Sequence, residues 1–254
     1  MFTFNKTGKR YLSVSLLLIM LYLYTMPCKG QQIPDNIVDT VLTSINQIRS
    51  QNGLEILIVD QKLNMVAEAH SIKMAELDIL SESNTALGTP FERIKSAGLT
   101  DVNNLVVVSS AKNIDLLRNQ LESPENLLKI LSPEMTNMGI GVKQDSAGEF
   151  WLTIHMSERA ITFSEFTLSQ SYTEDARRSI TIKGNSSYGK IKVVFASTET
   201  LNPKVDVDQI IRPQPNGDFE VTLKFGEATG SFYFEFYVEK DGVYKLMNFF
   251  NISI

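Results

Sequence analysis

The sequence contains few of the residues from which reactive sites are most often built. Its 254 residues include a single cysteine, Cys28, and only two histidines, His70 and His155. One cysteine cannot form a disulfide within the chain, so no disulfide framework supports the fold. Any mechanism that requires an imidazole must use one of the two histidines.

Several signatures of known chemistries are also missing. The sequence has no glycine-rich phosphate loop, no zinc-binding helix motif and no Gly-x-Ser-x-Gly turn. It contains no internal repeat, and its 29 acidic residues outnumber its 24 basic ones, for a formal net charge of −5. No run of basic residues is present, so nucleic acid is not expected as a partner.

The first thirty residues have the organisation of a secretory signal peptide. A basic stretch over residues 6–10 precedes an uncharged apolar block over residues 11–27, and Gly30 is a plausible cleavage point. We therefore predict a signal peptide over residues 1–30 and a secreted or cell-envelope location. Cleavage would remove four positive charges and the only cysteine, which leaves a mature net charge of −9 without thiol chemistry. An uncleaved signal anchor and a lipoprotein modified at Cys28 are the alternatives.

Two kinds of hydrophobic periodicity divide the rest of the chain near residue 160. Before that point, apolar residues recur every three or four positions, which is typical of helices with one buried face. Asp60, Thr89 and Ser123 are placed to cap helices, the last two directly before a proline. Three short apolar segments are expected to be strands: residues 105–108, 138–142 and 150–156. We predict one mixed domain over residues 31–160.

After residue 160, apolar and polar residues alternate, which is typical of half-buried strands. The clearest alternating sets are Ile180/Ile182, Ile191/Val193/Phe195, Phe219 to Phe225 and Phe232 to Val238. Asn216-Gly217 and Asp241-Gly242 are typical of tight hairpin turns. We predict five to seven strands over residues 161–254, in an antiparallel β-sandwich of immunoglobulin-like type. Tyr233 and Tyr237 would face outward, where they could contribute to recognition.

An ordered series of short phrases runs through residues 35–157. The phrases include Ile45-Asn46-Gln47-Ile48-Arg49, Leu63 to Ala69 with His70-Ser71, Thr89-Pro90-Phe91-Glu92-Arg93, Ser123-Pro124 and Met138-Gly139-Ile140-Gly141-Val142. Their order and spacing resemble the CAP/SCP (cysteine-rich secretory protein-like) family in its bacterial, cysteine-free form. The resemblance implies an α-β-α sandwich. The expected fold class is therefore α+β, with this sandwich followed by the β-sandwich.

The resemblance also implies a central cleft in which two histidines and acidic residues gather and sometimes hold a divalent metal. Here the first histidine position falls at or beside Glu82, the acid before the sheet becomes Asn103, and the second histidine becomes Asn126. Asparagine neither titrates nor ligates transition metals well. The candidate cleft residues are Glu82, Asn103, Glu125 and Asn126. We expect a degenerate site and assign no catalytic residue, cofactor or metal, although Glu82 and Glu125 could together hold a hard cation such as calcium.

The two histidines are secondary candidates. His70 lies on the apolar stripe of its predicted helix, which favours a residue of the core or its rim. Alternation places His155 on the same strand face as Trp151 and Thr153, where it would face solvent or the cleft.

These observations favour an exported, non-catalytic binding or interaction protein whose partner is an unknown extracellular protein, glycan or lipid. One alternative is an extracellular hydrolase that uses a non-standard arrangement of Glu82, His70 or Ser123. A second alternative is a lipid or sterol carrier, which requires an apolar groove.

Overall fold

The computed structural model describes residues 36–170, 178–197, 205–226 and 230–253. The predicted signal peptide over residues 1–30 lies outside them. Among the described residues, no helix has both the length and the apolar character needed to cross a membrane.

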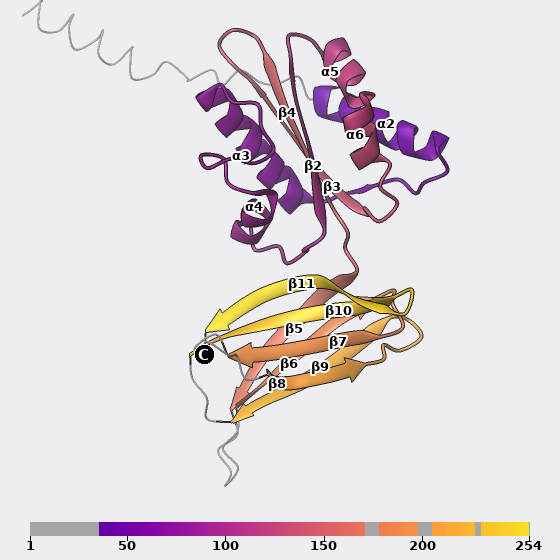
Figure 1. The fold of residues 1–254 in the computed structure, drawn as a ribbon, viewed down its shortest axis with the longest axis vertical. Helices are drawn as coiled ribbons and strands as arrows, with labels where there is room; N and C mark the ends of the chain where they lie inside the picture. The colour runs from indigo at the N-terminus through magenta and orange to yellow at the C-terminus, as the bar shows by residue number, and fades with distance from the viewer. Residues whose placement is uncertain (1–35, 171–177, 198–204, 227–229, 254) are drawn as a thin grey trace, which may run out of the picture. The chain divides into compact units, whose positions relative to one another are not determined.

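The part of the chain up to Ser157 is built around a four-stranded sheet. Its strand order is β1 (Ile58–Val59), β3 (Asn137–Gln144), β4 (Phe150–Ser157) and β2 (Asn104–Ala111). The β1–β3 pair is parallel and the other two pairs are antiparallel. One face is covered by α3 (Gln61–Leu77) and α4 (Pro90–Ser96), and the other by α2 (Asn36–Gln51), α5 (Ile114–Leu121) and α6 (Pro124–Ile130) (Figure 1).

The helices of this part begin where the sequence predicts. Asp60 caps α3 by accepting hydrogen bonds from the backbone of Lys62 and Leu63. Thr89 and Glu92 form a reciprocal capping box at the start of α4, and Ser123 caps α6. Such caps satisfy backbone N–H groups that have no partner within the helix, so they fix where each helix starts.

Two glycines let α3 lie directly on the sheet. A Cβ atom at Gly139 would come within 2.0 Å of the Leu63 carbonyl carbon, and one at Gly141 within 2.1 Å of the Glu68 nitrogen. Ser71, on the same helix, donates a hydrogen bond to the Gly141 carbonyl at 2.9 Å. The Gly-Ile-Gly phrase on β3 therefore sets how closely the helix approaches the strand.

On the opposite face, the buried guanidinium of Arg49 ties α2 to the segment that follows α6. Its Nη1 donates to the carbonyls of Ile130 at 2.7 Å and Ser132 at 2.9 Å, and its Nη2 donates to Met135 at 3.1 Å. Its Nε donates to the Glu55 carbonyl at 2.8 Å. Arg49 is only 1% exposed, and these four carbonyls satisfy its buried guanidinium.

The part of the chain from Ile161 onward contains two antiparallel sheets around one hydrophobic core. The first sheet has the order β11 (Val243–Ser253), β10 (Ser231–Lys240), β7 (Ile191–Ser197) and β8 (Val205–Ile211). The second has the order β5 (Ile161–Gln170), β6 (Arg178–Ser186) and β9 (Asp218–Gly226). The fold class is therefore α+β, with an α-β-α part followed by a β-rich part, as predicted.

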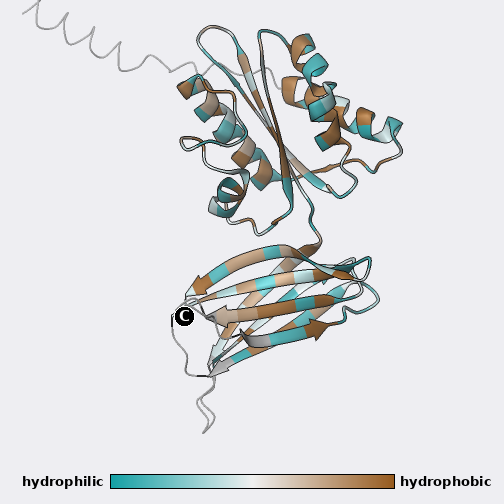
Figure 2. Ribbon diagram, in the orientation of Figure 1, coloured by the Kyte–Doolittle hydropathy of each residue, from teal (hydrophilic) through white to brown (hydrophobic). Residues whose placement is uncertain are grey.

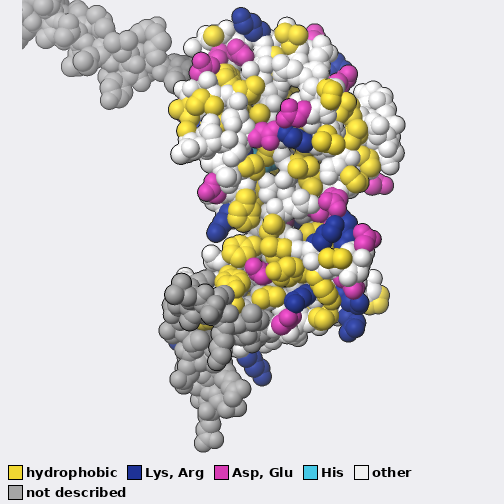
Figure 3. Space-filling model, viewed as in Figure 1, with side chains coloured by type: hydrophobic (Ala, Val, Ile, Leu, Met, Phe, Trp, Pro, Cys, Tyr) yellow, Lys and Arg dark blue, Asp and Glu magenta, His cyan; other side chains and the backbone are white. Residues whose placement is uncertain are grey.

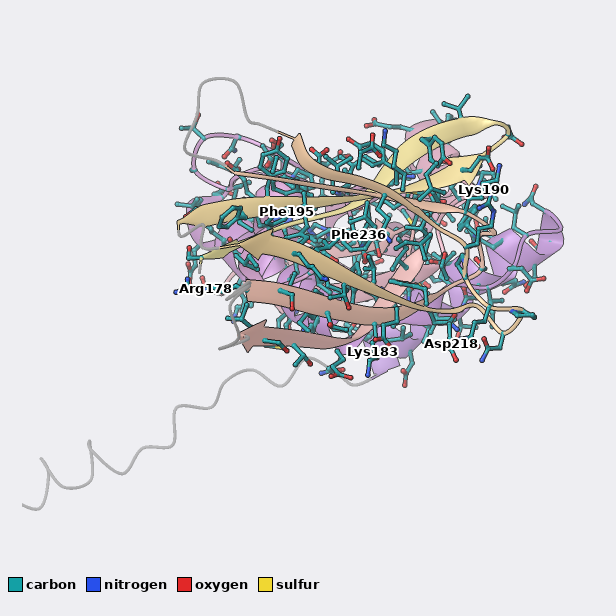
Figure 4. The ribbon with its side chains drawn as sticks, turned by 90° about the horizontal axis from the view of Figure 1, so that it is seen from below. Arg178, Lys183, Lys190, Phe195, Asp218 and Phe236 are labelled. Atoms are coloured by element: carbon teal, nitrogen blue, oxygen red, sulfur yellow. The ribbon has the colours of Figure 1, made fainter. Side chains whose placement is uncertain are left out.

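Aromatic side chains fill the space between these two sheets. Phe195 and Phe236 lie between the sheets, whereas Lys183 and Asp218 lie at the periphery (Figure 4). Figure 2 shows hydrophobic and hydrophilic residues alternating along these strands, which is the period that the sequence displays. The immunoglobulin-like type and the boundary at residue 160 stay predictions.

The segment between α4 and β2 pairs with β11. The Val102 N–H donates to the Met247 carbonyl at 2.8 Å, and the Phe249 N–H donates to the Thr100 carbonyl at 3.1 Å. Between these two bonds lies Asp101, which is 2% exposed and accepts hydrogen bonds from Ser157 at 3.0 Å and from both Nε and Nη2 of Arg159. Asn248 completes this buried polar cluster, because its Nδ2 donates to Asp101 at 3.3 Å.

Candidate functional site

A polar cleft lies between the loop that follows α3 and the beginning of α6, beside strand β2. Its volume is about 570 Å³, and its lining includes Glu82, Ser123, Glu125 and Asn126. The structure thus brings together three of the four candidate cleft residues. In Figure 3, acidic and basic side chains meet near the middle of the α-β-α part on the face that is in view.

Lys129 provides the positive charge beside this cleft. Its ammonium forms an ion pair with the carboxylate of Glu82 and lies 3.6 Å from that of Glu125, one helical turn earlier on α6. The Lys129 side chain is 18% exposed, so the pair with Glu82 is partly shielded from water. An ammonium group therefore holds Glu82, which the sequence resemblance places at or beside the first histidine position.

Asn126 and Ser123 are engaged with the backbone. Asn126 donates from Nδ2 to the Gln120 carbonyl at 2.8 Å, which joins the end of α5 to the beginning of α6. The Ser123 hydroxyl accepts from the Asn126 N–H at 3.4 Å as part of its helix cap. Both side chains therefore help to hold the wall of the cleft in place.

Asn103 does not line this cleft. Its Nδ2 donates to the carboxylates of Glu158 at 2.7 Å and Glu134 at 3.3 Å. Those two acids also bind Lys240, at 3.4 Å and 2.7 Å respectively. The amide at the family's acid position therefore belongs to a charged cluster at the start of β2.

The two histidines lie together on the face of the sheet that α3 covers. His70 of α3 and His155 of β4 are 1% and 0% exposed, and their ring centroids are 6.3 Å apart. The Thr153 hydroxyl lies 3.2 Å from Nδ1 of His70, and Arg93 donates from Nε to Nε2 of His155 at 3.4 Å. His70 thus fits the expected core position. His155 shares its face with Thr153 as predicted, but α3 covers that face, so the expectation that it faces solvent or the cleft was wrong.

Burial keeps both imidazoles neutral near neutral pH. Desolvation, and then the charge of Arg93, lower the pKa of His155 to about 3. The same two causes lower the pKa of His70 to about 4, although the nearby Ser81 backbone opposes the shift without meeting hydrogen-bond geometry. Because Nε2 of His155 accepts from Arg93, its proton lies on Nδ1, for which the described part of the chain offers no hydrogen-bond partner.

Arg93 connects the imidazoles with the loop that forms one wall of the cleft. Its Nη2 donates to the Glu82 carbonyl at 2.8 Å, and its Nη1 donates to the Gly88 carbonyl at 2.9 Å and the Leu87 carbonyl at 3.3 Å. Burial lowers the pKa of Arg93 to about 10, and the charges of Glu82 and Glu92 oppose this shift. Sequence reasoning used Arg93 only within a packing phrase, because nothing in its spacing indicates a contact with His155.

The arrangement lacks the partner that an acid–base pair requires. Within the described ranges, no carboxylate hydrogen-bonds to either imidazole, and the Glu82 carboxylate binds Lys129 instead of His70. No group of three or more His, Cys, Asp and Glu side chains among those residues could hold a metal ion. A second hollow of about 570 Å³, largely apolar, lies between α3 and α4.

One family model matches most of the α-β-α part of the chain. The family model described as the cysteine-rich secretory protein family matches residues 42–156. No curated protein matches the chain.

Several solved structures are similar to about half of the chain. An outer surface protein from Borrelia burgdorferi is 18% identical, with 51% of this chain and 98% of that one covered and a TM-score of 0.47. An extracellular protein containing an SCP domain from Bacillus anthracis is 23% identical, with 52% and 44% covered and a TM-score of 0.47. A cysteine-rich secretory protein from Staphylococcus aureus is 19% identical, with 51% and 40% covered and a TM-score of 0.40. The region matched by the family model spans α3, α4, β2 and β3 with the Gly139-Ile140-Gly141 packing phrase, and residues 42–156 belong to the cysteine-rich secretory protein (CAP) family.

Proposed function

We propose that this chain is an exported, non-catalytic binding protein that holds a polar ligand in the cleft around Glu82, Glu125 and Asn126. The observation that carries the proposal is the ion pair of Lys129 with Glu82, at the place where the family resemblance implies an imidazole. The Lys129 ammonium has no lone pair, so unlike an imidazole it can neither act as a general base nor ligate a metal. The leader over residues 1–30 supports export.

The state of the histidines supports the absence of catalysis. A general base works best when its pKa lies near the operating pH. The pKa values of His70 and His155 are about 4 and about 3, because both rings are buried beside Arg93. Neither ring has a carboxylate to orient it or to stabilise its protonated form, which an activated serine would require.

The cleft offers chemistry for a neutral or basic polar ligand. Glu82, Glu125 and Lys129 together carry a net charge of −1, so anions are disfavoured. The Glu125 side chain is 80% exposed, so its carboxylate, 3.6 Å from the Lys129 ammonium, is accessible to a ligand. An extracellular glycan or a polar segment of another protein would match these groups.

Binding of the full-length chain to arrays of extracellular polysaccharides and synthetic peptides tests the proposal. Glu125→Gln and Lys129→Met should each change the affinity for a bound probe by about fivefold or more, because each removes a charge from the cleft. Glu122→Gln is the matched control, since Glu122 is an exposed acid near α6 that does not line the cleft. Turnover of any probe that is abolished by Glu82→Gln or Ser123→Ala would overturn the proposal.

A further inference from the structure

The hollow between α3 and α4 is separate from the polar cleft. Its walls come from α3, from α4 and from the loop over residues 85–88, and its volume is about 570 Å³. Met65, Val66, Ala69, Leu87 and Ala97 give it a mainly apolar lining. This volume lies within the range of 300–1,000 Å³ that small-molecule sites usually occupy.

The charges at this hollow are opposite in sign to those of the chain as a whole. Lys73 and Arg93 line it, and its only acid is Glu92. The Glu92 carboxylate is held by the Thr89 N–H at 2.7 Å and the Thr89 hydroxyl at 2.9 Å in the helix cap. The lining therefore carries a net positive charge on a chain whose formal charge is −5.

Arg93 places a positive charge at the hollow, where the charges of Glu82 and Glu92 act on it without forming an ion pair among the described residues. Its hydrogen bonds go to three backbone carbonyls and to His155, all of which are neutral acceptors, and none of the ion pairs among the described residues includes it. His70, which also lines the hollow, is 1% exposed, and no described residue hydrogen-bonds to its Nε2. The guanidinium of Arg93 has its hydrogen bonds satisfied, so only Nε2 of His70 is in a state that buried polar groups seldom adopt, and this atom indicates a missing polar partner at the hollow.

We propose that this hollow binds a compact organic anion, namely a carboxylate or sulfonate carried on an aromatic or branched apolar body. The apolar body would contact Val66, Ala69 and Leu87, and the anionic group would be attracted by Lys73 and Arg93. This inference goes beyond the proposed function, because the hollow is a different one and its charge favours the opposite kind of ligand.

A matched pair of fluorescent probes tests both parts of this inference on the full-length chain. The anionic probe is 1-anilinonaphthalene-8-sulfonate, and the uncharged probe is N-phenyl-1-naphthylamine, which has the same ring system without the sulfonate. The anionic probe should bind at least threefold more tightly than the uncharged one at low salt, and raising the salt should reduce this difference.

Two pairs of variants assign the binding to the hollow. Ala69→Trp places an indole in the hollow and should abolish this binding of both probes, whereas Glu76→Trp, at an exposed position on the same helix, should not. Lys73→Glu should weaken the anionic probe about three- to tenfold and leave the uncharged probe unchanged. Lys62→Glu makes the same charge change outside the hollow and should have no effect.

The outcomes separate the possibilities. The proposed site is overturned if Ala69→Trp leaves the binding of the probes unchanged while its unfolding temperature matches that of the Glu76→Trp control. Equal affinity for the two probes, with no response to Lys73→Glu, overturns the anion preference and leaves a purely apolar groove of the kind that a lipid carrier needs. Reduced binding of the anionic probe in Lys73→Glu alone supports the proposal.

Discussion

Arg93 donates a hydrogen bond from Nε to Nε2 of His155 across 3.4 Å. A guanidinium in this position requires the imidazole to be an acceptor, because a protonated ring offers only N–H donors. The contact therefore fixes the tautomer of His155 and places a like charge beside any additional proton. This relationship distinguishes the pair of histidines from an acid–base pair, in which a carboxylate would stabilise the protonated ring.

The first prediction concerns acid stability. Both histidines have folded-state pKa values below the usual 6.5, so the unfolded chain binds protons more readily than the folded one. Their contribution to stability is complete above pH 6.5 and is lost as the pH falls toward 4. Between pH 6.5 and 5, the free energy of unfolding should fall by up to about 1.4 kcal/mol per pH unit for each histidine.

Urea unfolding at a series of pH values measures this slope. His155→Gln keeps an acceptor for Arg93 but cannot titrate, so it should remove about half of the slope between pH 6.5 and 5. A slope identical to that of the unmodified chain would show that His155 is not neutral and buried in solution.

The second prediction concerns the contact between α3 and β3. Gly141→Ala should lower the free energy of unfolding by about 3 kcal/mol or more, because its Cβ would overlap the backbone at Glu68 and force the helix away from the strand. Gly189→Ala is the control, since a Cβ there meets nothing within 4 Å, and it should change stability by less than about 0.5 kcal/mol. If denaturant unfolding shows the same loss of free energy of unfolding for Gly141→Ala and Gly189→Ala, the close packing of α3 on β3 is refuted.

The third prediction concerns Arg49. Arg49→Met keeps an apolar stem of similar length but leaves the carbonyls of Glu55, Ile130 and Met135 without this donor. Unsatisfied buried groups each cost about 1–3 kcal/mol, so a loss of about 3–5 kcal/mol is expected. Arg118→Met removes an exposed arginine from α5 and should have little effect. Thermal and urea unfolding of the two variants provide the comparison.

The fourth prediction concerns Asp101. Asp101→Ala leaves the Ser157 hydroxyl and the partly buried Arg159 guanidinium without their shared acceptor, which should destabilise the chain by about 3 kcal/mol. Asp208→Ala breaks an exposed ion pair with Lys192 and should cost less than about 1 kcal/mol. Circular dichroism during urea unfolding measures both values, and similar losses would contradict the role assigned to Asp101.

Much of the fold could be predicted from local pattern. The caps at Asp60, Thr89 and Ser123 are short-range hydrogen bonds, so the sequence is sufficient to locate them. Strands β6, β9 and β10 alternate between buried and more exposed residues, and β7 does so up to Phe195, so these strands are recognisable from the sequence. Strand β11 does not, because Met247 is an extra residue opposite the Phe236/Tyr237 step, and it and the next residue are both buried.

The candidate site was only partly predictable, because some of its contacts join residues close in the sequence and others join residues far apart. Lys129 follows Glu125 by four residues, a spacing that brings side chains together on a helix and could have indicated their ion pair. The contact of Arg93 with His155 joins residues 62 positions apart, and no local signal reports it. The orientation of Asn103 likewise depends on Glu158, which lies 55 positions later in the sequence.

The pairing of β11 with residues 100–102 has a consequence for anyone who shortens this chain. A fragment that ends near residue 160 keeps the CAP region but loses the carbonyl of Met247 and the amide of Asn248. The N–H of Val102 would then need water as its partner, and Asp101 would face solvent where it is now enclosed. Such a fragment should be less stable than the same residues in the intact protein. Adding β10 and β11 without the rest of their sheets would not restore the lost stability, because those two strands need the shared aromatic core to keep their structure.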